Sequence, residues 1–209
     1  MKTIRRRSLA LVVWVISCFA IASPACTVCA ETLTGRVVRV ADGDTITVLD
    51  PQRQEHKIRL SGIDAPEKAQ PFGQRSKENL ARLAYGQDVE VVWSKRDRYG
   101  RIVGRVMVPP LDCRSCKSSL DASMAQLTAG MAWWYRKYAP EQLPDERRRY
   151  ELAEAEAKAK QVGLWRDPDP VAPWDWRRGM GGILHDEGID GLPWTVLKAG
   201  LAEQTGHTL

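Results

Sequence analysis

Five short stretches of alternating apolar and polar residues between residues 33 and 108 constrain the fold of this chain most strongly. They are rich in β-branched and aromatic residues and are separated by turn-forming residues, the pattern expected of short β-strands. One helix is predicted after the third strand, over residues 71–84, and Gly86 ends it. Five short strands with one inserted helix favour a small barrel. The strands are expected at residues 33–40, 45–49, 55–61, 89–93 and 102–108.

Two further helices are predicted after the last strand. A helix up to Gly130 is predicted from apolar residues that recur at helical spacing, namely Leu120, Met124, Leu127 and Met131. A third helix is predicted from about Pro144 to Val162, with Gly163 as its C-terminal cap. The fold class expected from these elements is α+β. With 209 residues and 44% hydrophobic residues, the chain is long enough to bury a core of its own.

The two ends of the chain have a different composition from the middle. Basic residues at positions 2–7 precede an apolar run over residues 9–22, which predicts an export signal and not a membrane span. Cleavage after Ala30 is favoured. Residues 23–25 offer a second site, and the sequence ending at Cys18 resembles a lipoprotein attachment box. The chain is therefore expected to be periplasmic or secreted, with a lipid anchor at Cys18 as the alternative.

Charge alone does not identify a partner. The formal net charge is +5, but removal of the basic leader leaves a mature chain of about +1. The remaining charge is uneven, because residues 31–110 are net positive and residues 111–209 are net negative. The first part is the better candidate for binding an anionic partner.

The predicted export bears on the state of the cysteines, because exported proteins meet oxidising conditions. Cys113 and Cys116 lie in the mature chain as a C-x-x-C pair, and in an exported protein such a pair is expected to be a disulfide. The other three, Cys18, Cys26 and Cys29, fall in or beside the leader. Cleavage before Cys26 would leave two C-x-x-C pairs, which is formally a zinc pattern, although export favours disulfides.

The densest group of chemically active residues lies between positions 59 and 67. Arg59 belongs to the third predicted strand, whereas Asp64 and Glu67 follow in a loop that Pro66 stiffens. Carboxylates are ligands for hard divalent cations such as calcium, and the arginine fork matches a pair of phosphate oxygens. The group suits metal-assisted phosphoryl chemistry. For a single window of this kind, a surface ion pair beside a turn is the more ordinary explanation.

Two other sites bear on the same chemistry. Asp42 and Asp44 flank Gly43 in the turn of the first hairpin, and Arg101 opens the last strand. An Asp-Gly-Asp sequence by itself is usually turn chemistry, and a lone arginine is usually surface charge. Their joint occurrence at strand ends of one barrel favours a common site.

Together these segments resemble the staphylococcal nuclease (thermonuclease) family. The resemblance spans residues 33–165 and rests on four segments that match in order and spacing. They are Val40-Ala41-Asp42-Gly43-Asp44-Thr45, Arg59-Leu60 through Asp64-Ala65-Pro66-Glu67, Asp97-Arg98-Tyr99-Gly100-Arg101 and Gly130-Met131-Ala132. The resemblance implies a five-stranded OB-fold barrel with three α-helices, and a secreted calcium-dependent nuclease that cuts DNA and RNA with little sequence preference, leaving 3′-phosphates.

The resemblance also implies roles for single residues. Asp44, Asp64 and the backbone carbonyl of Ala65 look like the Ca²⁺ ligands, and Glu67 resembles the proposed general base. Arg59 and Arg101 would bind the phosphate and stabilise its developing charge. Tyr99 resembles a tyrosine on the phosphate side of the bound nucleotide. Ala65 stands where the family often has threonine, which matters little to a ligand that comes from the backbone.

The aromatic residues that follow Gly130 allow two interpretations. Trp133, Trp134, Tyr135 and Tyr138 are expected in a loop, where such residues usually pack but can also stack on bases. Tyr138 is the substrate-binding candidate among them. No stable protein partner is implied, so a monomer is expected.

The expected organisation is a signal peptide at 1–30, the nuclease-like domain at 31–165 and an irregular tail of unknown role at 166–209. A non-catalytic nucleic-acid-binding barrel is the first rival, because OB-folds often bind single strands. A secreted structural or inhibitory protein is the second, and it leaves the carboxylates and arginines unexplained.

Overall fold

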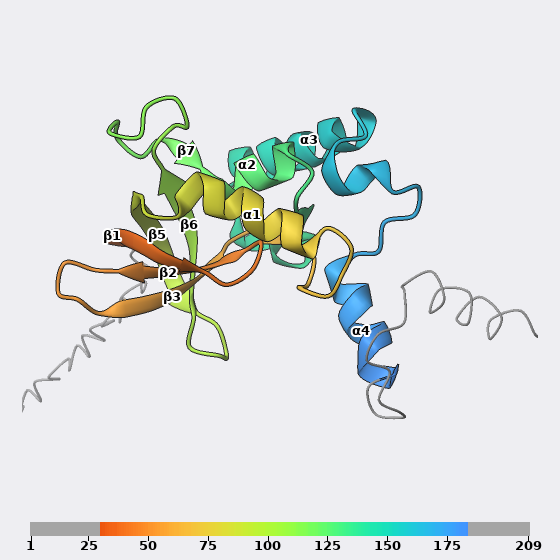
Figure 1. Ribbon diagram of the computed structural model, residues 1–209, viewed down its shortest axis with the longest axis horizontal. Coiled ribbons are helices and arrows are strands. Elements are labelled where there is room, and N and C mark those ends of the chain that lie inside the picture. Colours follow the sequence, from red (N-terminus) through yellow and green to blue (C-terminus); the bar gives the residue numbers. More distant parts are fainter. Residues whose placement is uncertain (1–29, 184–209) are drawn as a thin grey trace, which may run out of the picture.

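The computed structural model describes residues 30–183 and shows a closed β-barrel with helices packed against it (Figure 1). The strands form one sheet in the order β3-β2-β1-β5-β6-β7, and β3 also pairs in parallel with β6, which closes the barrel. This is the predicted five-stranded OB-fold barrel of an α+β protein. The strands of the sheet are β1 (Glu31–Val40), β2 (Thr45–Leu49), β3 (Glu55–Leu60), β5 (Asp88–Arg96), β6 (Ile102–Val108) and the short β7 (Leu120–Asp121).

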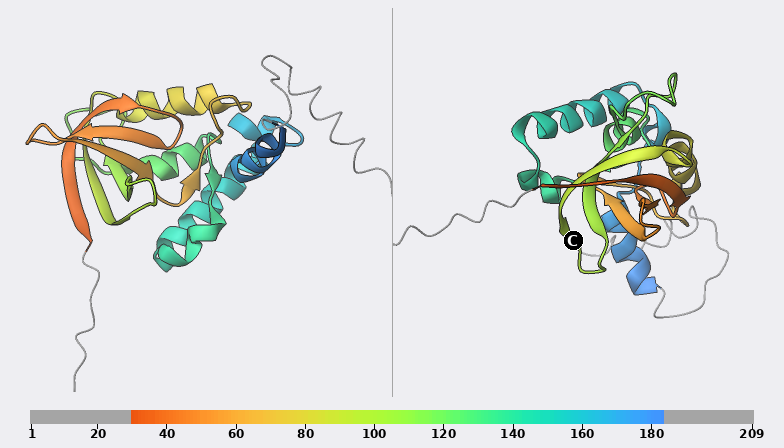
Figure 2. Two further views of the ribbon diagram at one scale, coloured as in Figure 1. Left: turned by 90° about the horizontal axis from the view of Figure 1, so that it is seen from below. Right: turned by 90° about the vertical axis from the view of Figure 1, so that its left-hand side faces the viewer.

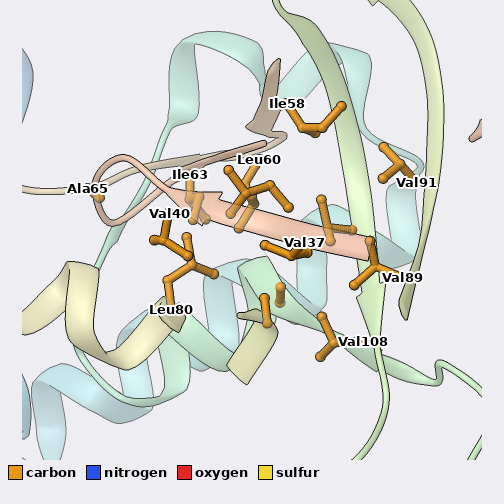
Figure 3. Close-up of a cluster of buried hydrophobic side chains, with 14 of the residues drawn as sticks. Val37, Val40, Ile58, Leu60, Ile63, Ala65, Leu80, Val89, Val91 and Val108 are labelled. Carbon is orange, nitrogen blue, oxygen red and sulfur yellow. The ribbon is translucent and has the colours of Figure 1, made fainter. Parts of the chain in front are cut away.

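The barrel core follows from the alternation within the strands. In β3, Ile58 and Leu60 are fully buried, whereas Lys57 and Arg59 face the other side of the sheet. Figure 3 shows Ile58 and Leu60 gathered with Val37, Val91 and other apolar side chains in a common interior. Arg59 therefore leaves the core face, as the sequence predicts, while its backbone stays in the ladder.

A second, two-stranded sheet was not expected from the sequence. It pairs β4 (Ile63–Asp64) with β8 (Trp133–Trp134), and Asp64 lies opposite Trp133. The sequence predicts loops for both segments, because two-residue strands carry no readable alternation. The pairing ties the loop that carries Asp64 to the aromatic segment after Gly130.

The helices are α1 (Gly73–Ala84), α2 (Ala122–Thr128) and α3 (Pro144–Ala159), with 3₁₀ turns η1 (Arg136–Glu141) and η2 (Gly163–Arg166). The end predicted for α3 is wrong, because the helix stops at Ala159 and Gly163 begins the next turn. Gly163 has φ +59°, and a Cβ there would come within 2.2 Å of the Gly130 carbonyl oxygen. The glycine is therefore required for a close backbone contact, where Leu164 N–H donates to that same oxygen (2.8 Å).

The segment predicted as an irregular tail contains a fourth helix, α4 (Pro173–Ile183). Pro173 opens it, a position where proline suits a helix. Figure 1 shows α4 beside the loop that precedes α1, and the left view of Figure 2 places α3 and α4 on the same side of the barrel strands. The prediction of an irregular tail is therefore wrong for residues 173–183, while residues 184–209 lie outside the described part of the chain.

The predicted signal over residues 1–30, with Cys18, Cys26 and Cys29, also lies outside the described part except for Ala30. Cys113 and Cys116 form a disulfide in the turn between β6 and β7. Between them, Arg114 donates to the carbonyl oxygens of Arg82 (2.6 Å) and Leu83 (2.9 Å) at the end of α1. The disulfide-bonded turn thus places the guanidinium of Arg114 at the C-terminal end of α1. Within residues 30–183, no helix is both long and apolar enough to cross a membrane.

Glu154 of α3 holds the aromatic segment on the helix. Its carboxylate is 1% exposed and accepts the backbone N–H of Trp134 (3.0 Å), the guanidinium of Arg136 (2.8 Å) and the ammonium of Lys158 (2.9 Å). Removal of this acceptor leaves the N–H of Trp134 buried without a partner.

We expect Glu154→Ala to lower the free energy of unfolding by about 1–3 kcal/mol, the cost of one unsatisfied buried donor. Urea denaturation followed by circular dichroism measures it. Glu156→Ala is the matched control on the same helix, because Glu156 pairs only with Lys160 among the contacts described, and both side chains are exposed. Equal losses in the two variants would contradict this account.

Candidate active site

The site is built around Arg59, which lies between two buried carboxylates. Its Nη1 forms an ion pair with Oδ2 of Asp44, and its Nη2 lies 2.7 Å from Oδ1 of Asp64. Asp44 is 4% exposed and Asp64 is 1% exposed. Asp44 comes from the turn between β1 and β2, and Asp64 comes from β4. One side chain on β3 thus holds together two acidic residues that are twenty positions apart.

Contacts with α1, α2 and the loop after β4 fix the position of the turn that carries Asp44. A Cβ on Gly43 would lie 1.9 Å from Oγ of Ser76, so only glycine fits between the turn and α1. The side chain of Gln126 on α2 donates to the Gly43 carbonyl (2.6 Å). The N–H of Ala65 donates to Oδ2 of Asp44 (2.9 Å), which joins the turn to the loop after β4. The position of Asp44 is therefore set by two helices and a loop.

Burial and charge act in opposite directions on these groups. Burial raises the pKa of Asp44, but the charge of Arg59 and the hydrogen bonds from Arg59 and Ala65 outweigh it and hold this pKa below its usual value. Burial lowers the pKa of Arg59, whereas Asp44 and Asp64 raise it above its usual value. Burial, followed by the charge of Asp44, raises the pKa of Asp42 to about 6. At neutral pH, Asp44 and Arg59 are therefore ionised.

Glu67 lies at the exposed edge of this group. Its side chain is 39% exposed, and its backbone N–H donates to Oε1 of Gln70 (3.0 Å). The loop is tight here, because a Cβ on Gly73 would lie 1.9 Å from the Glu67 carbonyl oxygen. A carboxylate in this position is accessible to water while its backbone stays fixed.

Arg101 joins the site through the hairpin. Its Nε donates to Oδ2 of Asp97 (2.7 Å), and its Nη1 lies 3.4 Å from the hydroxyl of Thr45, which in turn donates to Oδ1 of Asp44 (3.0 Å). The guanidinium also lies 5.6 Å from the ring centre of Tyr99, which is 69% exposed. The structure thus brings Arg101 and Tyr99 to the side of the site next to Asp44.

Tyr138 belongs to a different group of residues. It packs edge-on against Tyr135 (5.0 Å between ring centres), and Lys95 of β5 lies 5.0 Å from its ring centre. Tyr135 in turn stacks in parallel on Trp174 of α4, at 5.2 Å and an interplanar angle of 5°. The predicted substrate tyrosines therefore lie in two separate places, with Tyr99 beside Arg101 and Tyr138 in an aromatic cluster.

Arg177 is a residue of the site, within the described part of the chain, that the sequence pattern does not predict. Its Nη2 lies 2.7 Å from Oδ2 of Asp64, and its Nη1 lies 2.6 Å from Oε1 of Glu67. Burial lowers the pKa of Arg177, but these two carboxylates raise it above its usual value. The only sequence signal was Pro173 followed by Trp174 and Trp176. The glycines that follow, beginning at Gly179, hid the helix.

Comparison with known proteins identifies the family to which the chain is similar. The family described as "Staphylococcal nuclease homologue" matches residues 57–167. The chain is 43% identical over 145 residues to "Micrococcal nuclease" of Shigella flexneri, covering 69% of this chain and 80% of that protein. It is 42% identical over 150 residues to "Uncharacterized endonuclease" of Escherichia coli, covering 71% and 87% respectively. It is 41% identical over 176 residues to "Protein ParB" of Escherichia coli, covering 83% and 94%.

The family match begins within β3 and ends just after η2, so it includes Arg59, Asp64, Glu67 and Arg101 but stops before α4. The relatives extend the likeness over more than two thirds of the chain at over 40% identity. The closed barrel, the carboxylates gathered on Arg59 and these relatives all lead to the same conclusion: the chain belongs to the staphylococcal nuclease family.

Proposed function

We propose that this protein is an exported, calcium-dependent nuclease that hydrolyses phosphodiester bonds in DNA and RNA with little sequence preference. Membership of the family and the relatives named nuclease and endonuclease support nuclease activity. One observation of the site carries the proposal furthest: Arg59 holds two buried carboxylates together beside a third, accessible one, Glu67. A purely structural barrel has no use for such a costly arrangement of charge.

The donor atoms fit a hard cation. Asp44 and Asp64 offer carboxylate oxygens that are both bound to the same guanidinium, and Ala65 can add its carbonyl oxygen. Within residues 30–183, no group of three or more His, Cys, Asp or Glu side chains is arranged to hold a metal. The two carboxylates and the carbonyl would therefore need water as further ligands, which suits Ca²⁺. The bound ion would neutralise part of the negative charge that develops on the phosphate.

The side chains divide the remaining work. Glu67 accepts or orients the proton of the attacking water, because it is ionisable, accessible and adjacent to Asp64 through Arg177. Arg101 is oriented by Asp97 and donates to a phosphate oxygen. Arg59 donates to the phosphate in the same way once a metal ion has replaced it on Asp44 and Asp64. A phosphodiester is a poor electrophile, so these donors stabilise the extra charge of the transition state. Breakage of the bond to the 5′ oxygen then leaves a 3′-phosphate and a 5′-hydroxyl.

The cellular setting is part of the same proposal. The basic and apolar leader supports export, the Cys113–Cys116 disulfide suits an oxidising compartment, and a monomer suffices because one chain supplies the whole set of residues. A lipid anchor at Cys18 is the alternative to a free protein. Tyr99 is proposed to contact the phosphate side of the nucleotide, and Tyr138 to stack on a base.

Calcium dependence and product chemistry can be tested together. The protein, purified after export with its own leader, is mixed with duplex DNA, single-stranded DNA and RNA, in Ca²⁺, in Mg²⁺ and in excess chelator. We expect all three substrates to be cut in Ca²⁺ and none in chelator. Product 5′ ends should be labelled directly by a polynucleotide kinase, because they carry hydroxyls.

Two outcomes of this assay would contradict the proposal. Equal cleavage in chelator would exclude the metal, and 5′ ends that need prior phosphatase treatment would reverse the assigned bond breakage. Tight binding of all three substrates without cleavage in any divalent cation would favour the alternative hypothesis of a non-catalytic nucleic-acid-binding barrel.

We expect Glu67→Gln to lower kcat by about 10²- to 10⁴-fold, the usual contribution of a positioned acid or base. Arg101→Ala should lower kcat by about 10²- to 10³-fold, as expected for the loss of one charge-stabilising donor. Arg36→Ala is the matched arginine control, because Arg36 donates to the Gly86 carbonyl elsewhere on the barrel. Steady-state kinetics in saturating Ca²⁺ measure kcat, and thermal melting checks that each variant is folded. A normal kcat in folded Glu67→Gln would refute the assignment of Glu67 as the general base.

A further inference from the structure

The helix α4 brings a cation to the same carboxylates that the proposed metal needs. Arg177 directs Nη2 to Oδ2 of Asp64 (2.7 Å) and Nη1 to Oε1 of Glu67 (2.6 Å), with a longer contact from Nη1 to Oδ1 of Asp64 (3.4 Å). Since Arg59 already donates to Oδ1 of Asp64 at 2.7 Å, both oxygens of this carboxylate accept hydrogen bonds from guanidinium groups.

Packing explains how α4 reaches this position. Trp174 stacks in parallel on Tyr135 and meets Trp133 edge-on, at 5.7 Å between ring centres. Trp133 pairs with Asp64 across the β4–β8 ladder. Because residues three apart share a helix face, a helix held at Trp174 presents Arg177 to Asp64. The side chain of Gln70 adds a tether by donating to the Val171 carbonyl (2.6 Å).

Electrostatic repulsion prevents the divalent ion and the guanidinium of Arg177 from binding Asp64 at the same time. A divalent ion bound by Asp44 and Asp64 would take up the lone pairs of Asp64 next to the guanidinium of Arg177, and like charges at such separation repel strongly in a partly buried site. Arg177 also occupies Oε1 of Glu67, the carboxylate assigned to activate water. Arg177 is 43% exposed, so water can solvate it on release, whereas Asp64 is 1% exposed.

We propose that α4 is a built-in, reversible inhibitor of this nuclease, in which Arg177 competes with the divalent cation for Asp64 and pins the general base until metal binding displaces it. This inference rests on the proposed metal role of Asp44 and Asp64. Docked α4 mainly weakens the affinity for the metal. It has less effect on turnover at saturating metal, because the bound metal then displaces Arg177 from Asp64 and Glu67 together.

The size of the effect follows from the population of the two states. If α4 is docked in about nine molecules of ten, the apparent affinity for metal is lowered about tenfold, since only the open fraction binds. Removal of Arg177 abolishes this competition without touching the metal ligands. A lysine keeps the charge but loses the fork that contacts two carboxylates at once.

The test is calorimetric titration of Ca²⁺ into the exported protein without nucleic acid, comparing wild type with Arg177→Gln, Arg177→Lys and Arg178→Gln. Arg178 is the matched control, because it lies on the same helix, is exposed and pairs with Asp175. We expect the Kd for Ca²⁺ to fall about tenfold in Arg177→Gln, by less in Arg177→Lys, and to stay unchanged in Arg178→Gln. In wild type, Ca²⁺ should also speed trypsin cleavage at Arg177 and Arg178, identified by mass spectrometry.

An unchanged or weaker Kd in folded Arg177→Gln would overturn the inference, and with normal Ca²⁺-dependent cleavage it would leave the proposed function intact. A tighter Kd in Arg178→Gln equal to that in Arg177→Gln would also overturn it, because the effect would then be one of general charge. Absence of Ca²⁺ binding in both wild type and Arg177→Gln would instead refute the metal assignment, and with it both proposals.

Discussion

The ion pairs of Arg59 with Asp44 and Asp64 are the interaction on which the site depends. Two carboxylates that are almost fully buried repel each other and lose hydration, so their burial is costly unless a cation is paired with them. Arg59 offsets both losses with one planar group whose two arms reach both acids. Because Arg59 lies on β3, which pairs with β2 on one side and β6 on the other, the position of these charges is as rigid as the barrel itself.

The charged residues around Arg59 differ in how far their side chains are exposed to solvent. Asp44 and Asp64 are buried, Arg101 is oriented by Asp97 at the mouth of the hairpin, and Glu67 faces solvent from a tight loop. Groups that hold an ion need a fixed geometry, whereas a group that exchanges protons with water needs access. The same barrel meets both needs, because strand ends are rigid and the loops between them are open.

The segment beyond the family match adds a fourth helix to the site. Trp174 packs on Tyr135 and Trp133, and Arg177 completes a network that runs from Thr45 through Asp44, Arg59 and Asp64 to Glu67. The described contacts of α4 include the aromatic cluster around Trp174, the tether from Gln70 and the salt bridges of Arg177, and Trp176 on the same helix is buried as well. An attachment of this kind can be stable at rest and still yield to a competing cation.

The sequence by itself determined the barrel and most of the site. Local alternation gave the strands, and the order of the acidic and basic segments gave Asp44, Arg59, Asp64, Glu67 and Arg101, because these residues follow directly from turns and strand ends. Only the tertiary structure decided three things: the β4–β8 pairing, the role of Gly163 and the docking of α4 with Arg177 on Asp64. Each of these rests on a contact between distant residues, separated by 113 positions for Arg177 and Asp64, and no local pattern encodes such a contact.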